Sequence, residues 1–205
     1  VIDMLPRRTE QGELAYLPMN GGSIYNTAIA LGRLGASTGY FSGLSTDFFG
    51  ESLQQGLKDS HVDLRYTKIQ DKPTMLAFVK LENGHARYSF FDENSANRML
   101  TRKDMPKLKP DVTAMHFGSI ALINEPAAST HAALLKRESR KRVICLDPNI
   151  RPTVIKSKPP YLKRLNQRIR LVDILKISDE DVRWMTGHAD FAAAARKWLK
   201  AGVKV

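Results

Sequence analysis

The sequence has a single cysteine, Cys145, and no long apolar stretch. A lone cysteine cannot close a disulfide within the chain, which excludes a disulfide-bonded scaffold. Runs such as VICL at 143–146 fall far short of the roughly 18 consecutive apolar residues of a membrane helix. Residues 1–20 also lack the order of charged, apolar and small residues that marks a secretory signal. We therefore expect a protein of the reducing cytoplasm with no membrane partner.

Acidic residues are scarce relative to basic ones: 21 Asp and Glu against 32 Lys and Arg give a net charge of 32 − 21 = +11. The cations gather in three runs, at 98–110, 136–142 and 151–170, and the last run contains no acid. Such runs are typical of a solvated helix face, and aromatic residues are not interleaved with them as in single-strand binders. Binding to nucleic acid stays an alternative, and it predicts an affinity that falls steeply with salt.

The 205 residues are enough for a sizeable core, and 42% hydrophobic with 26% charged residues excludes a disordered chain. Most of the chain alternates between strand-like and helix-like segments, which predicts an α/β fold with a mostly parallel sheet flanked by helices. Strands are expected at 1–5, 38–42, 114–118, 143–146 and 174–177, with another beginning at 203–205. Helices are expected after Gly22, after Asp47 as N-cap, and at 125–141, 161–170, 179–186 and 190–201.

Three local details sharpen this prediction. Pro6 should end the first strand. The first helix should bury Ile24, Ala28, Leu31 and Leu34 on one face and end at Gly35. Because the pattern stops where an alternating fold places a core strand, we expect one domain over 1–205 that lacks its C-terminal part.

The alternation breaks between Tyr66 and Phe91. There, 74–81 and 85–91 are predicted to form a β-hairpin around the turn Glu82-Asn83-Gly84, because Asn-Gly is the preferred two-residue hairpin turn. A hairpin inserted in an α/β chain suggests a lid. We place the lid segments at about 10–20 and 66–98.

Polar residues and glycines follow several of the predicted strands, at the edge where open α/β sheets bind ligands. They are Asp3, Gly21 and Gly22 with Asn26, Asp147-Pro-Asn149-Ile-Arg151, and Lys176-Ile-Ser178-Asp-Glu-Asp181. A carboxylate accepts from two hydroxyls and an amide both donates and accepts, which suits a polyhydroxylated ligand. Taken singly, Asp3 is as well explained by a turn or cap, the glycine pair by a tight turn, and Asn26 by a helix cap. The five histidines show no metal-ligand spacing.

The segment from Gly21 to Gly35, followed by Phe41-Ser-Gly-Leu-Ser-Thr-Asp47-Phe-Phe-Gly50, resembles the N-terminal signature of the ribokinase-like (PfkB) carbohydrate kinases. Asp3 resembles the family's sugar-binding Asp, and 147–151 resembles its Asp-x-Asn-x-Arg segment. The amino-acid sequence that follows the hairpin, and that of residues 175–187, is most similar to bacterial fructokinases. The resemblance covers essentially the whole chain and implies a ribokinase-like fold with a small β-sheet lid.

The resemblance implies a sugar kinase that transfers phosphate from ATP to an alcohol group, with fructose preferred over ribose or 2-keto-3-deoxygluconate. The implied cofactors are ATP and Mg²⁺, with a monovalent cation as a further candidate. The implied sugar contacts are Asp3, Gly21, Gly22, Asn26, Tyr88, Phe90, Ser119 and Arg151. The implied phosphate contacts are Lys176, Ser178 and Asp181, with Asp181 also near the metal.

Two departures from the family pattern limit what the resemblance implies. Ser178 stands where the family's Asn-x-x-Glu element has its Asn, and Asp181 keeps the carboxylate of that element. The late Gly-Ala-Gly-Asp turn, whose Asp is the family's catalytic base, does not occur in these residues. The chain therefore resembles the substrate-binding part of a kinase, and a non-catalytic sugar-binding relative stays an alternative.

The lid aromatics and the loop arginine also have alternative explanations. Plain sheet packing is the alternative for Tyr88 and Phe90, and a salt bridge is the alternative for Arg151. Family members commonly pair through their lids, so we expect a homodimer.

Overall fold

The computed structural model describes residues 1–82 and 85–205 and divides into two compact units, Val1–Leu100 and Thr101–Val205. We call them unit 1 and unit 2 and describe each by itself. The centre of the predicted hairpin turn, Asn83-Gly84, lies outside the described residues. Across the described ranges, no helix is both long and apolar enough to cross a membrane.

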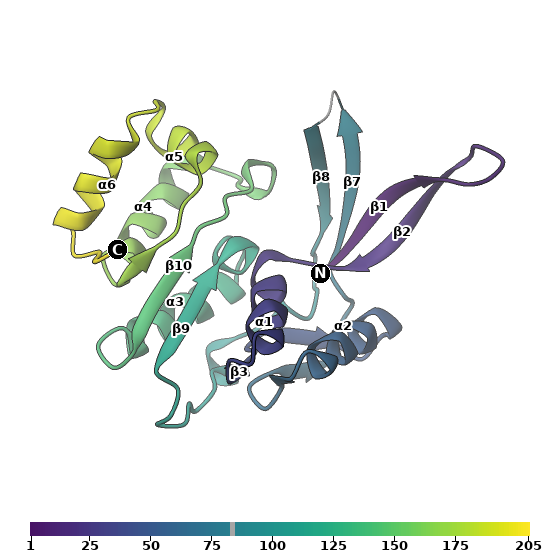
Figure 1. Ribbon diagram of the computed structural model, residues 1–205, viewed down its shortest axis with the longest axis horizontal. Helices are drawn as coiled ribbons and strands as arrows, with labels where there is room; N and C mark the ends of the chain where they lie inside the picture. Colours follow the sequence, from purple (N-terminus) through teal and green to yellow (C-terminus); the bar gives the residue numbers. More distant parts are fainter. Residues whose placement is uncertain (83–84) are drawn as a thin grey trace. The chain divides into compact units, whose positions relative to one another are not determined.

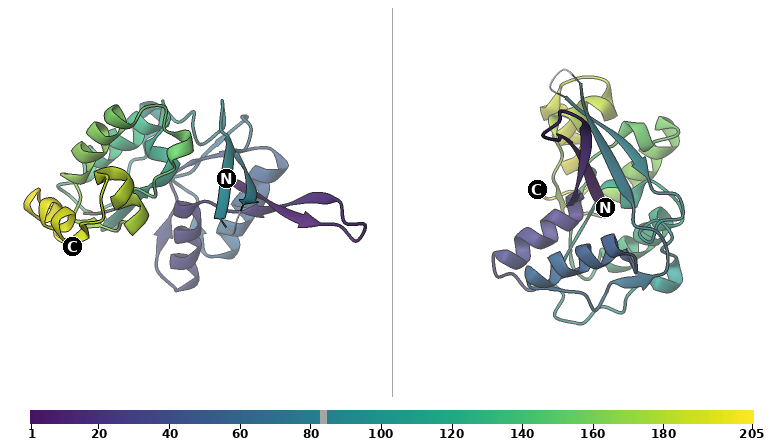
Figure 2. Two further views of the ribbon diagram at one scale, coloured as in Figure 1. Left: turned by 90° about the horizontal axis from the view of Figure 1, so that it is seen from above. Right: turned by 90° about the vertical axis from the view of Figure 1, so that its right-hand side faces the viewer.

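Unit 1 carries a four-stranded sheet of order β2-β1-β7-β8, which we call the lid. Its strands are β1 (Ile2–Arg8), β2 (Leu14–Asn20), β7 (Leu76–Glu82) and β8 (His85–Phe91). β1 pairs antiparallel with β2 and parallel with β7, and β7 pairs antiparallel with β8. Figure 1 shows both strand pairs projecting from the layer that holds α1 and α2, and Figure 2 shows the same arrangement from the side. The predicted hairpin strands are confirmed.

The prediction that Pro6 ends the first strand is wrong. β1 continues to Arg8, and Pro6 pairs with Tyr16 of β2. On its other side β1 pairs with β7 only from Ile2 to Met4, so beyond Met4 it has a partner on one side alone. Proline is tolerated in such an edge position because its missing N–H removes no ladder hydrogen bond there.

The remaining elements of unit 1 form a small α/β layer. They are α1 (Ser23–Arg33), α2 (Phe48–Asp59) and the parallel pairs β3 (Thr38–Gly39) with β5 (Val62–Asp63) and β4 (Gly43–Ser45) with β6 (Lys68–Gln70). Of the strand expected at 38–42, only Thr38–Gly39 forms, and β4 begins just beyond the predicted range. Asp47 caps α2 as predicted, because its carboxylate accepts from the Gly50 N–H at 2.7 Å.

The buried face of α1 differs from the prediction. Tyr25, Ala28 and Gly32 are buried, whereas Leu31 and Leu34 are exposed. The Tyr25 hydroxyl donates to the Leu53 carbonyl of α2, and a Cβ at Gly32 would overlap the Ser60 carbonyl, so close approach to the neighbouring segment selects this face. Gly35, at φ +81°, ends the helix as predicted.

Unit 2 is built on a parallel sheet of order β11-β10-β9, with β9 (Ala114–Gly118), β10 (Val143–Asp147) and β11 (Ile174–Leu175). Figure 1 shows β9 and β10 running side by side in the same direction. The helices are α3 (Ala127–Glu138), α4 (Lys158–Ile169), α5 (Asp179–Thr186) and α6 (Phe191–Lys200). Short 3₁₀ turns lie at Arg102–Asp104, Ser119–Leu122 and Pro152–Val154.

The core of unit 2 follows the predicted alternation of strands and helices. Ile144 and Leu146 of β10 are fully buried, as are Leu134 of α3 and Leu165 of α4. The residues expected to begin a last strand join the edge of the sheet, because the Leu175 N–H donates to the Val205 carbonyl at 2.8 Å. The α/β class with a small β lid is therefore confirmed.

Candidate functional site

The glycine turn of unit 1 is shaped around a carboxylate. Gly21 follows β2, and its N–H donates to the Val1 carbonyl at 3.0 Å. A Cβ at Gly21 would overlap the carboxylate of Asp3, so only glycine lets the backbone lie against this side chain. Asp3 itself lies within β1 rather than in a turn or cap. Asp3 and Gly21, both predicted to contact the sugar, are thus neighbours. The position of the Asp3 carboxylate accounts for the glycine at position 21.

The register of the lid places aromatic rings on the same sheet face as this carboxylate. Asp3 of β1 is opposite Ala77 of β7, and Ala77 is opposite Phe90 of β8. Because residues opposite each other share a face, Asp3, Ala77 and Phe90 form one row. Tyr88, two residues from Phe90, shares that face, and the two rings stack with centroids 5.7 Å apart and planes 11° apart. One lid face therefore combines a carboxylate with a pair of stacked aromatic rings.

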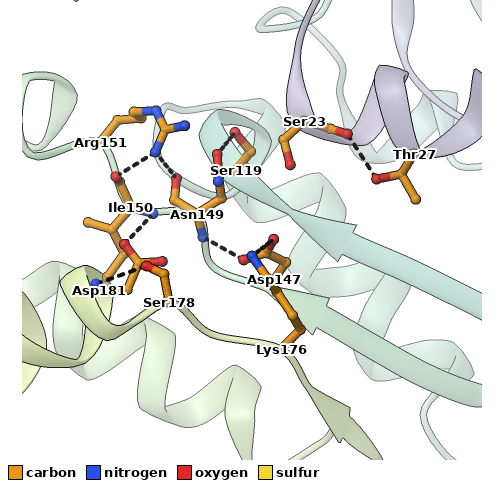
Figure 3. Close-up of polar contacts among 10 residues, drawn as sticks. All are labelled: Ser23, Thr27, Ser119, Asp147, Asn149, Ile150, Arg151, Lys176, Ser178 and Asp181. Atoms are coloured by element: carbon orange, nitrogen blue, oxygen red, sulfur yellow. Dashed lines mark hydrogen bonds and ion pairs between the residues drawn. The ribbon is translucent and has the colours of Figure 1, made fainter. Parts of the chain in front are cut away.

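The start of α1 is held by hydrogen bonds to backbone carbonyls. Gly22 precedes the helix at φ +104°, a conformation that favours glycine, and its carbonyl accepts from the Asn26 N–H at 2.8 Å. Asn26 is exposed inside the helix, so it is not a cap. The Thr27 hydroxyl donates to the Ser23 carbonyl at 2.9 Å in the same turn (Figure 3).

In unit 2 the polar residues gather where β10 and β11 end, as their positions after the strands predicted (Figure 3). Asp147, the last residue of β10, is buried, and its Oδ2 pairs with the Lys176 ammonium at 3.0 Å. Its Oδ1 accepts from the Asn149 N–H at 3.2 Å. One carboxylate thus holds both its own loop and the cation that follows the neighbouring strand. The sequence identified both residues as candidates but not this ion pair.

A second buried carboxylate joins the same two loops. Ser178 caps α5 by accepting from the Asp181 N–H at 3.1 Å, and Oδ1 of Asp181 accepts from the Ile150 N–H at 3.1 Å. Burial raises the pKa of Asp181, and the negative charge of Asp147 adds to that increase. The role of Ser178 as cap was missed, although Ser followed by Asp three residues later is a recognised N-cap pattern.

The loop after β10 is ordered by contacts with its surroundings. The Ser119 hydroxyl donates to Oδ1 of Asn149 at 3.4 Å, and both residues have positive φ, 60° and 43°. The Arg151 guanidinium donates to the Ile150 carbonyl at 3.0 Å and to the Asn149 carbonyl at 3.4 Å. Every site residue predicted in unit 2 therefore belongs to one hydrogen-bonded group at the carboxyl edge of the sheet.

The donor chemistry of this edge fits a magnesium–nucleotide complex. Mg²⁺ is bound by one or two carboxylates together with phosphates and water, and Asp147 and Asp181 supply carboxylate oxygens here. In the part of the chain that the structure describes, no three His, Cys, Asp or Glu side chains gather to hold a metal by themselves.

Several cations of two of the basic runs make contacts inside unit 2. Arg168, in the run at 151–170, is buried and donates to the carbonyls of Leu122 and Ala128 at 2.7 and 3.1 Å. In the run at 136–142, Arg137 and Arg142 both pair with the buried Glu138. These cations hold segments of the protein together, which weakens the argument for nucleic-acid binding from charge alone.

Comparison with known proteins identifies the family. The family model for pfkB family carbohydrate kinases matches residues 18–205. The chain belongs to this family. It is 49% identical over 205 residues to a fructokinase of Rhizobium leguminosarum bv. trifolii, and the match covers 100% of this chain and 63% of that protein. The chain therefore spans less than two thirds of the length of this relative.

Solved structures show the same fold. A fructokinase from Vibrio cholerae O395, solved in a form with bound fructose, ADP and calcium ion, is 26% identical with a TM-score of 0.86. The match covers 98% of this chain and 65% of that one. A fructokinase from Xylella fastidiosa with bound ATP has a TM-score of 0.86 at 23% identity, covering 100% of this chain and 66% of that one. The ribokinase-like architecture predicted from the sequence is confirmed.

Proposed function

We propose that the protein of which this chain forms the sugar-binding part phosphorylates fructose with ATP. The observation that carries the proposal is the lid row, where Asp3 shares a sheet face with Phe90 and the stacked Tyr88. A carboxylate accepts from two hydroxyls of a sugar, and aromatic rings cover its C–H faces and exclude water. Membership of the family and 49% identity to a fructokinase support fructose as the substrate.

The two units contribute different parts of this function. In unit 1, Asp3 and the backbone of Gly21 and Gly22, with Asn26, would hold the sugar, and the lid segments at about 10–20 and 66–98 would enclose it. In unit 2, the Lys176 ammonium and the Ser178 hydroxyl would contact phosphate oxygens. Ser119 and Arg151 would line the loop next to them. Magnesium, bound with ATP, would neutralise phosphate charge near Asp181.

Transfer of the phosphoryl group requires the sugar hydroxyl to lose its proton as the phosphorus–oxygen bond forms. In this proposal the chain positions the sugar and the phosphates and excludes water. Positioning and electrostatic stabilisation supply most of the rate enhancement in phosphoryl transfer. The cytoplasm remains our prediction for its location, from the sequence.

The direct test is ADP release by the natural full-length polypeptide that carries this sequence, supplied with Mg-ATP. Fructose, ribose, 2-keto-3-deoxygluconate and a blank without sugar are compared. We expect turnover that depends on fructose and only background release in the blank. Fructose binding without turnover would instead support the non-catalytic sugar-binding relative, and absence of both would reject the proposal.

We also propose that two copies pair through the other face of the lid. Phe78 packs edge-on against Tyr16 at 5.1 Å and Phe91 at 5.5 Å, and on this face Leu14, Tyr16 and Phe91 are 59, 37 and 62% exposed. An exposed apolar sheet face of this kind is typical of a protein interface. Sedimentation equilibrium should give a dimer for the wild type and a monomer for Phe91→Ser, and a monomeric wild type would contradict the proposal.

A further inference from the structure

The β7–β8 hairpin of the lid leaves the α/β layer of unit 1 on two legs, at residues 73–75 and 92–96. The two legs are joined to each other at their base, where the Ala96 N–H donates to the Pro73 carbonyl at 3.0 Å. Any change in the angle of the hairpin must therefore occur at this base. The hairpin is held in part by the pairing of β7 with β1 and by a hydrogen bond from the Ile2 N–H to the Met75 carbonyl at 2.9 Å. The contacts between the base and the start of α2 are a further attachment.

Asp47 makes the strongest of these contacts. Its Oδ2 accepts from the Thr74 N–H at 2.7 Å, and its Oδ1 accepts from the Thr74 hydroxyl at 2.6 Å and the Gly50 N–H at 2.7 Å. Burial alone would raise the pKa of the Asp47 carboxyl, but the hydrogen bonds from Thr74 and Gly50 outweigh it and hold that pKa below its ordinary value. The carboxylate is thus ionised at neutral pH, and its hydrogen bonds to Thr74 are charge-assisted.

Capping α2 does not require this arrangement. Asp190 caps α6 in unit 2 with a single hydrogen bond from the Ala193 N–H at 2.8 Å. Asp47 makes the equivalent bond to Gly50 and in addition uses both oxygens to hold Thr74, which lies 27 positions away in the sequence. The contacts to Thr74 are therefore a separate feature that needs its own explanation.

Other strands of the lid are fastened to the same layer. Asn20, at the end of β2, exchanges two hydrogen bonds with Ser52 of α2, at 3.0 and 3.1 Å. The second leg of the hairpin is held at Ala96, whose carbonyl accepts from the Gln70 amide at 2.7 Å. A Cβ at Gly43 would overlap that same carbonyl. The second leg also has charged contacts, because Arg98 pairs with Asp92 at 3.2 Å and Lys72 donates to Asn94 at 3.1 Å. Asp47 supplies the charged contact to the first leg, at Thr74.

We propose that Asp47 is a positioning residue that fixes the β7–β8 hairpin on α2 through Thr74 and so holds Tyr88 and Phe90 over the sugar. The inference rests on the proposed function for its consequence, because the rings matter only if a sugar binds at Asp3. The attachment itself does not depend on any ligand. Loss of the Asp47–Thr74 contacts should let the hairpin open more often without unfolding the α/β layer.

Hydrogen–deuterium exchange of the natural full-length polypeptide tests the attachment, with four variants. Asp47→Asn keeps an oxygen for the Gly50 cap but turns an amide donor toward the Thr74 N–H. Thr74→Val removes the hydroxyl and keeps the shape of the side chain, whereas Thr74→Ser keeps the hydroxyl. Asp190→Asn is the matched control, because it changes a cap of the same type without a lid contact.

We expect roughly ten-fold faster exchange in β7 and β8 for Asp47→Asn and a smaller increase for Thr74→Val, since a hydrogen bond to a charged group is lost in each. Exchange in α1 and α2 should stay at the wild-type rate, and Thr74→Ser and Asp190→Asn should match the wild type in the hairpin. Equal acceleration across the hairpin, α1 and α2 would show a merely structural cap and overturn the proposal. Unchanged hairpin exchange in Asp47→Asn would overturn it as well.

Fructose titration of the same variants separates this proposal from the proposed function. If the wild type binds fructose, Asp47→Asn should weaken binding several-fold, and fructose should slow hairpin exchange less than in the wild type. If the wild type and Asp47→Asn had the same affinity for fructose, and fructose slowed hairpin exchange equally in the two proteins, the positioning role would be contradicted. If the wild type does not bind fructose, the proposed function fails, and the exchange result without sugar still decides whether Asp47 holds the hairpin.

Discussion

The two units present their candidate site residues in opposite ways. In unit 1 the candidate site residues can lie together only because Gly21 has no side chain where the Asp3 carboxylate lies. In unit 2 the group depends on polar atoms that are present, because Asp147 and Asp181 tie two loops through an ion pair and backbone hydrogen bonds. Unit 1 should therefore be sensitive to added atoms, and unit 2 to lost hydrogen bonds and to changes in charge.

The largest expected difference between the units is their response to acid. His131 of unit 2 is buried, and this burial, with the nearby positive charge of Arg168, lowers its pKa from 6.5 to about 4. The unfolded chain binds this proton as the pH falls through 6.5, and the folded unit does not until about 4. Stability that is fully present above pH 6.5 is therefore lost between those values, by about 3 kcal/mol.

The Asp47 contacts of unit 1 should persist over the same range. The pKa of Asp47 lies below its ordinary value of 3.8, so its contribution is present above 3.8 and is lost only at lower pH. Urea unfolding followed by hydrogen exchange at pH 7 and pH 4.5 would separate the units. The His131→Gln variant should lose most of the pH dependence of unit 2, and a pH dependence as large as that of the wild type would contradict this account.

The next effect is steric and belongs to unit 1. Gly21→Ala places a methyl group against the Asp3 carboxylate, and we expect a cost of about 2 kcal/mol in unfolding together with weaker fructose binding. Thermal unfolding and calorimetric titration measure the two effects. In the Asp3→Ala background the same substitution should cost much less stability, because the overlapping atoms are gone. Additive costs would show that the two residues do not interact.

Much of the fold could be predicted from the sequence, and the predictions that were wrong share one cause. The strand and helix alternation, the cap at Asp47 and the hairpin strands follow from local periodicity and turn chemistry. The α1 face was predicted from Leu31 and Leu34, but the packing of Gly32 against Ser60 and the Tyr25–Leu53 hydrogen bond decided it. Those contacts join segments far apart in the chain, which periodicity cannot detect.

The site residues divide in the same way. Placement after strands was enough to select Asp147, Lys176 and Asp181, since the ends of parallel strands meet at one edge. Which of them pair could not be predicted, because the Lys176–Asp147 and Asp181–Ile150 contacts depend on how the two loops fold back. The neighbours of Asp47 were missed for the same reason, since Thr74 has no local signal.

A smaller effect concerns the helix start in unit 2. Ser178→Ala removes the oxygen that accepts from the Asp181 N–H, and a lost N-cap costs about 1 kcal/mol. Ser178→Asn should retain the cap, because asparagine is an equally good N-cap residue. Urea unfolding of both variants provides the comparison. Equal destabilisation by Ala and Asn would mean that the hydroxyl has another role.

The smallest effect on stability is expected at Asp181. Because burial raises its pKa, the charged carboxylate is costly to the fold, and Asp181→Asn keeps an oxygen for the Ile150 N–H. We expect a change in unfolding free energy within about 0.5 kcal/mol. Affinity for Mg-ATP should nevertheless fall, which calorimetry would detect. A large loss of stability would show that the charge itself holds the two loops together.

The measurement that tests the division between the units most directly is a crossed kinetic comparison in the natural full-length polypeptide. Asp3→Asn should raise the KM for fructose about ten-fold or more and leave the KM for Mg-ATP near the wild-type value. Lys176→Met should do the reverse. If Asp3→Asn changed the KM for Mg-ATP and left the KM for fructose unchanged, the assignment of the sugar to unit 1 would be contradicted.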